Sequence, residues 1–139
     1  MAITLISRKT ARAKIGTLLS AITTFVAVYD HQVKDFGGKS PVAMVYSDGT
    51  QTDRPAYARQ RHRYIVELWW KRSDDAATED YIDDLANSVR QKLIDNDALD
   101  GFWEDLTFDE AGSEMDYIIL DGVLYRRERL TVTCLVICE

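Results

Sequence analysis

The spacing of apolar residues predicts two amphipathic helices. Over about Arg8 to Phe25, apolar side chains recur every three or four residues and form one stripe. A second stripe runs through Ser73 to about Asn96. Because each helix has a single apolar stripe, we expect both to pack on one face of a sheet.

Alternating apolar and polar residues predict strands between and after these helices. They fall at Val26 to Tyr29, Val42 to Tyr46, Arg61 to Arg72, about Phe102 to Phe108, Met115 to Leu120, and about Tyr125 to Cys138. Asp121-Gly122 is typical of a hairpin turn. The order predicts an α+β fold: a mostly antiparallel or mixed sheet of about four to six strands with two helices packed on one face.

The strand over Arg61 to Arg72 has two unlike faces. Tyr64, Val66, Leu68 and Trp70 alternate with Arg63, Ile65, Glu67, Trp69 and Lys71. Trp70 is therefore predicted to lie in the core. Trp69 is predicted to lie on the opposite, charged face, toward water or a partner.

A polar segment between two strands predicts a long, mobile connection. Residues 47–60 contain few apolar side chains and open with a turn signal. The predicted partner-contacting part of this loop is Ser47, Asp48, Gly49, Thr50, Gln51, Thr52, Asp53 and Arg54. The whole chain, 1–139, is expected to be one domain, with 1–7 as a candidate N-terminal arm.

Composition limits the function classes. No apolar run reaches the roughly 18 residues that span a bilayer, and the N-terminal charges follow the apolar stretch rather than precede it, unlike a secretion signal. Cys134 and Cys138 would lie about 13 Å apart along one strand, too far for a disulfide. With only His31 and His62 besides, the sequence predicts no metal and no cofactor.

Charge is unevenly distributed along the chain. Residues 1–72 carry 12 basic and 5 acidic side chains, whereas residues 73–116 carry 2 basic and 15 acidic ones. Two solvated faces of different charge are the plain interpretation. The alternative is that a basic patch on one copy meets an acidic patch on the next, in a head-to-tail contact that can close into a ring.

The second interpretation defines a candidate interface between copies or with partners. Its members are the charged and aromatic residues of one strand face, of the acidic helix and of the last strand: Arg61, Arg63, Trp69, Lys71, Asp74, Asp75, Glu79, Asp80, Asp83, Asp84, Arg127 and Arg129. Arginine and tryptophan are enriched at binding hot spots. A solvated strand face with one stray aromatic remains the alternative.

The sequence contains no nucleophile with a base at recognisable spacing and no phosphate-binding glycine motif. We therefore expect no enzymatic activity. Asp48, Glu67 and Lys71 faintly suggest a metal-dependent nuclease, but a shared strand face does not by itself assemble a site. A further alternative is an inhibitor whose acidic helix imitates nucleic acid.

The order of segments resembles a known family. An N-terminal amphipathic helix is followed by VYD, PVAMVYSDGT, a polar loop, RHRYIVELWWKR, the acidic DDAATEDYIDDLANSVRQKL and LYRRERLTVTCLVI. This pattern, over about residues 8 to 138, resembles the tail terminator, or tail-completion, proteins of bacteriophages with long non-contractile tails. The resemblance is one of pattern and length, without a short invariant motif.

The resemblance implies a structural virion protein at the head-proximal end of the tail, assembled in the host cytoplasm. Such proteins form a hexameric ring that caps the tail tube, ends tube polymerisation and presents a surface for head attachment. The implied partners are further copies of the chain, the tail tube protein and a head-completion or neck protein. The loop segment at positions 47–54 is the part expected to contact the tail tube. DNA would pass through the lumen without specific binding. Another head–tail joining, neck or tube-related role is the alternative within this class.

Overall fold

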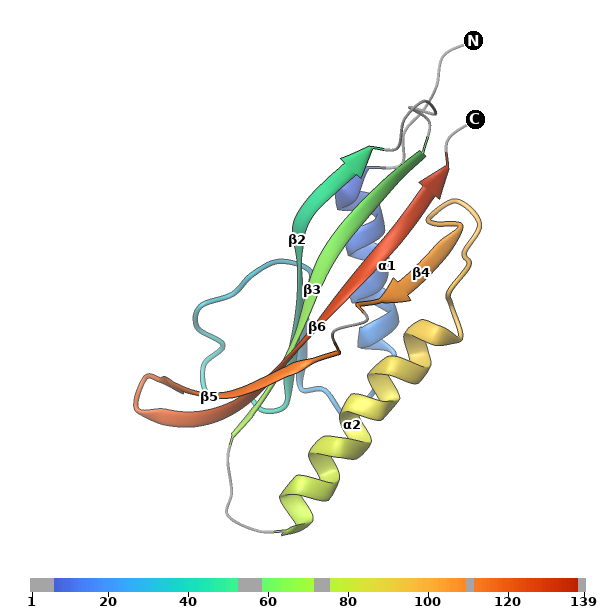
Figure 1. Ribbon diagram of the computed structural model, residues 1–139. Coiled ribbons are helices and arrows are strands. Elements are labelled where there is room, and N and C mark those ends of the chain that lie inside the picture. The colour runs from blue at the N-terminus through green and yellow to red at the C-terminus, as the bar shows by residue number, and fades with distance from the viewer. Residues whose placement is uncertain (1–6, 53–58, 72–75, 110–111, 138–139) are drawn as a thin grey trace.

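The computed structural model describes residues 7–52, 59–71, 76–109 and 112–137 (Figure 1). The elements are α1 (Arg8–Ser20), β1 (Ala27–Tyr29), β2 (Val42–Thr52), β3 (Arg59–Lys71), α2 (Ala76–Ile94), β4 (Asp105–Phe108), β5 (Glu114–Leu120) and β6 (Val123–Ile137). This order confirms the predicted α+β class. Residues 1–6 of the candidate arm lie outside the described residues, and Ser7 caps α1 by accepting a hydrogen bond from the Thr10 N–H.

The sheet has the order β1-β2-β3-β6-β4, and β5 also pairs with β6. β1 pairs parallel with β2, and the other pairs are antiparallel, so the sheet is mixed as predicted. β6 pairs along its length with β3 on one side. On its other side it pairs first with β5 and then with β4. Both helices lie on one side of the sheet (Figure 1).

The main core lies between the helices and this face of the sheet. Both helical stripes contribute to it, with Ile15 and Leu19 from α1 and Ile82 and Val89 from α2. Trp70 packs against them, as the strand alternation predicts. Cys134 is a free, fully buried thiol in the same cluster. Burial raises its pKa to about 12, so it behaves as a small apolar residue.

Helix α1 ends at Ser20, five residues before the predicted end at Phe25. The amides of Ala21 and Ile22 bond to carbonyls three residues back, which tightens the last turn. Two β-branched residues, Thr23 and Thr24, then disfavour further helix. Across the described residues, neither helix is long and apolar enough to span a membrane.

The predicted mobile loop is largely strand. Positions 47–52 belong to β2, and 59–60 to β3. Ser47 pairs with Tyr64 and Thr50 with His62, so β2 has one extra residue and forms a bulge, where Gly49 adopts a φ of 115°. The turn signal was therefore misread, because a glycine at positive φ serves a bulge as well as a turn. Residues 53–58 lie outside the described part.

Candidate assembly surfaces

Trp69 lies on the face opposite the helices, as predicted, but it is buried. It is 7% exposed and belongs to a second, smaller cluster with Phe36, Val42, Met44 and Tyr125. The Phe36 ring, from the segment between β1 and β2, lies edge-on to Trp69 at 5.3 Å and to Tyr125 at 5.2 Å. This segment covers one end of the outer face, so Trp69 cannot contact a partner from this conformation.

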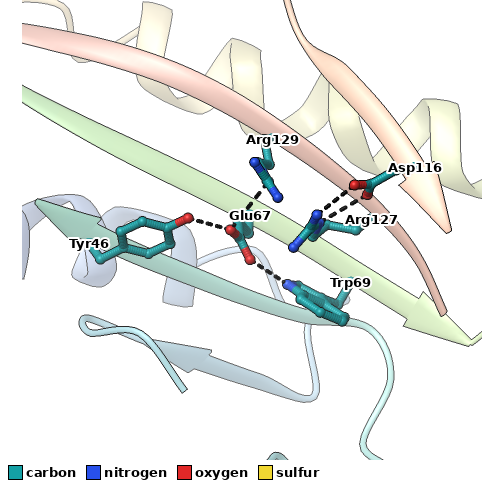
Figure 2. A network of polar contacts seen from close by, with 6 residues as sticks. All are labelled: Tyr46, Glu67, Trp69, Asp116, Arg127 and Arg129. Carbon is teal, nitrogen blue, oxygen red and sulfur yellow. Dashed lines mark hydrogen bonds and ion pairs between the residues drawn. The ribbon is translucent and has the colours of Figure 1, made fainter. Parts of the chain in front are cut away.

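Glu67 organises a polar network beneath this cover (Figure 2). Its carboxylate, only 3% exposed, accepts hydrogen bonds from the Tyr46 hydroxyl and, at 2.9 Å, from the Trp69 indole N–H. The Arg129 guanidinium lies 3.6 Å away. Burial and the bond to Glu67 raise the pKa of Tyr46, which keeps this hydroxyl a proton donor. Three strands are thus joined at one carboxylate.

Arg127 joins β5 to β6 and lies over Trp69. Its guanidinium donates two hydrogen bonds to Asp116, at 2.9 and 2.5 Å, and sits 5.3 Å from the Trp69 ring centroid (Figure 2). The paired hydrogen bonds lower the pKa of Asp116 and raise that of Arg127. Arg127 and Arg129, predicted as partner contacts, therefore both have partners within the chain.

The predicted basic face is exposed at both ends of β3 and buried between them. Arg63 is exposed and lies 3.5 Å from Asp48 on the β2 bulge, whereas Arg61 is only partly exposed. Lys71 is exposed at the other end of β3. Arg61 and Arg63 remain candidate partner contacts because they are within reach of solvent.

The acidic candidates lie at the opposite end of the molecule. Glu79, Asp80, Asp83 and Asp84 are exposed on the first half of α2, which follows the end of β3 (Figure 1). Glu79 forms an ion pair with Arg126 of β6. The remaining candidate residues, Asp53, Arg54, Asp74 and Asp75, lie outside the described residues. Arg61 and Arg63 thus lie apart from the acidic residues of α2, whereas Lys71 lies at the end of β3 that precedes this helix.

A second buried carboxylate was missed by the sequence reasoning. Glu128 is 4% exposed on the helix side of β6, where it accepts hydrogen bonds from Arg90 of α2 at 3.1 Å and from the Ser113 hydroxyl at 2.6 Å. Its position in the sequence was the available signal. Glu128 is two residues before Leu130 and four before Val132, so the three share the apolar face of the last strand. The network fixes α2 to the sheet just before β5 begins.

The residues considered for a nuclease do not converge on an open site. Glu67 is buried among its own partners, and Asp48 is paired with Arg63. Within the described ranges, no group of three or more His, Cys, Asp or Glu side chains is arranged to hold a metal ion. The geometry therefore offers no support for metal-dependent cleavage.

Comparisons with known proteins place the fold. No protein-family model and no curated protein matches the sequence. Among solved structures, the chain is similar to a chain of the structure described as "Virion of native gene transfer agent (GTA) particle", with a TM-score of 0.58 and 18% identity. The match covers 94% of this chain and 95% of that chain. The two chains share one fold over nearly their whole length.

Proposed function

We propose that this chain is a structural virion protein that forms a hexameric ring on the end of a phage tail tube. The observation that carries the proposal is the full-length fold match to a chain of a virion particle. The order of segments resembles that of the tail terminators, which supports a location at the end of the tail tube. The protein acts by shape and charge, without catalysing a reaction.

A ring whose two faces differ can cap a tube. One ring face imitates the surface that a tube subunit offers to the next subunit, and the other face lacks it, so polymerisation stops there. That other face binds a head-completion or neck protein. The exposed acidic residues of α2, among them Asp83 and Asp84, are candidates to line a lumen that repels DNA phosphates. The ring resides in the virion, after assembly in the host cytoplasm.

Deleting the gene from the genome that encodes the particle tests this function. We expect tails of uncontrolled length that are not attached to filled heads, because nothing ends tube growth. Electron microscopy measures both features, and supplying the intact gene in trans should restore them. Tails of normal length that merely fail to join heads would instead favour a neck role. Normal joined particles would contradict both.

A further inference from the structure

Two opposite edges of the sheet have no strand partner among the described residues. Within the described ranges, β1 pairs only with β2, and β5 pairs only with β6. The strand register places β1 and β5 at the same level along the sheet. One row of paired residues crosses all the strands between them: Ala27, Val42, Trp69, Arg127 and Asp116. Two copies placed side by side therefore bring β5 of one level with β1 of the other.

The β5 edge exposes large apolar side chains on its helix side. Met115, Tyr117 and Ile119 all point to the helix side of the sheet and are 42%, 54% and 72% exposed. Arg126 of β6 contacts the first two. Natural edge strands are usually protected by charged side chains, especially lysine, by proline or by a bulge. β5 carries Glu114 and Asp116 but contains no lysine, proline or register shift, and Asp116 is already bonded to Arg127. Such an edge is typical of a strand that pairs with another chain.

The β1 edge offers a matching hollow on the same side of the sheet. A cavity of about 310 Å³ opens between α1 and β1, and its lining includes Gly16 and Thr17 of the helix and Val28 of the strand. A Cβ on Gly16 would lie 3.2 Å from the Cβ of Asp30. The helix therefore comes close to the end of β1 and leaves the hollow open beside it.

We propose that β5 of one copy pairs antiparallel with β1 of the next and joins the sheets across the ring. β1 runs in the same direction as β6, and β5 runs opposite to β6, so the strands meet antiparallel. Continuing the rows places Asp116 beside Ala27, Met115 beside Val28 and Tyr117 beside Val26. Met115 then enters the hollow that Val28 lines. Tyr117 covers Val26, which is 59% exposed in the isolated chain.

Charge favours a second copy as the occupant of each edge. Residues 7–40, which carry α1 and β1, contain six basic and two acidic side chains. On the other side, residues 79–84 and 112–122 contain seven acidic side chains and no basic one. The Glu79–Arg126 ion pair holds the start of α2 beside the hairpin. Unlike edges of opposite charge make a heterologous contact, which closes into a ring when the rotation permits.

Filling the hollow tests the proposal, which rests on the proposed ring. Thr17 lines the hollow, and Thr17→Arg should raise the dissociation constant for self-association by about tenfold or more. A tenfold change corresponds to ~1.4 kcal/mol of binding free energy. Ser88→Arg is a matched control, since both residues are exposed in helices and both hydroxyls donate to the carbonyl four residues back, at 3.0 and 2.9 Å. Analytical ultracentrifugation measures association, with and without tail tubes, and circular dichroism verifies folding.

Cross-linking identifies the paired strands directly. In a Cys138→Ser background, mixing the Val26→Cys chain with the Tyr117→Cys chain should give a disulfide-linked pair, because facing residues on antiparallel strands have Cβ atoms about 5 Å apart. Linkage within the Tyr117→Cys chain alone would show β5 pairing with β5 and overturn the proposal. Unchanged rings in Thr17→Arg would overturn the edge assignment and leave the ring intact. A natural chain that stays monomeric, also with tubes present, would overturn both.

Discussion

Replacing Trp69 with alanine is expected to lower the free energy of unfolding by about 3–5 kcal/mol, the usual cost of removing a large buried aromatic side chain. The indole is 7% exposed and packs against Phe36 and Tyr125. It also donates to Glu67 and supports the Arg127 guanidinium. Urea denaturation followed by circular dichroism measures the change, which should appear as a lower midpoint.

Trp69→Phe is the matched control. It keeps a buried aromatic ring and loses the bond to the Glu67 carboxylate, so we expect a loss of about 2 kcal/mol, the contribution of a hydrogen bond to a charged group. Trp69→Ala protein that unfolds at the same urea concentration as the natural chain, yet fails to assemble, would contradict the burial. It would mean that the indole contacts a partner instead.

The second large effect is expected at Arg90. Arg90→Leu leaves the Glu128 carboxylate, 4% exposed, with the Ser113 hydroxyl but without its cation. Breaking a buried ion pair by removing one partner costs about 3–5 kcal/mol. Because the Arg90 side chain is 38% exposed, we expect a value near the lower end, about 3 kcal/mol, from urea denaturation.

The double variant Arg90→Leu/Glu128→Leu separates charge from packing. Apolar replacement of both partners removes the unpaired carboxylate, so stability should return to within about 1 kcal/mol of the natural chain. A double variant less stable than Arg90→Leu alone would show that Glu128 stabilises the fold through Ser113. The salt bridge would then contribute little.

Most of the fold follows from local periodicity. The stripes of α1 and α2 and the alternation of β3 each correspond to one side of the main core, which is why Trp70 was placed correctly. Helix ends were less predictable, because Ile22 packs on the core from outside the helix and so extends the apparent stripe. Local pattern locates a buried residue but does not report its backbone conformation.

The candidate surface was harder to predict for a different physical reason. Alternation assigned Trp69, Arg127 and Arg129 to the outer face correctly, but it cannot show what lies over a face. The cover depends on Phe36, a single aromatic in a polar segment whose place is set by tertiary packing. Arg127 and Arg129, which were predicted to contact a partner, instead form ion pairs across strands with Asp116 and Glu67. Gly49 likewise has a bulge conformation that only strand pairing reveals.

The mass of the assembled particle is the most direct measurement. Purified protein, alone at rising concentration and then with isolated tail tubes, is examined by native mass spectrometry and electron microscopy. A closed ring of six chains seated at one tube end is the predicted result. Single chains at every concentration, leaving the tube ends bare, would contradict a protein that works by docking copy against copy.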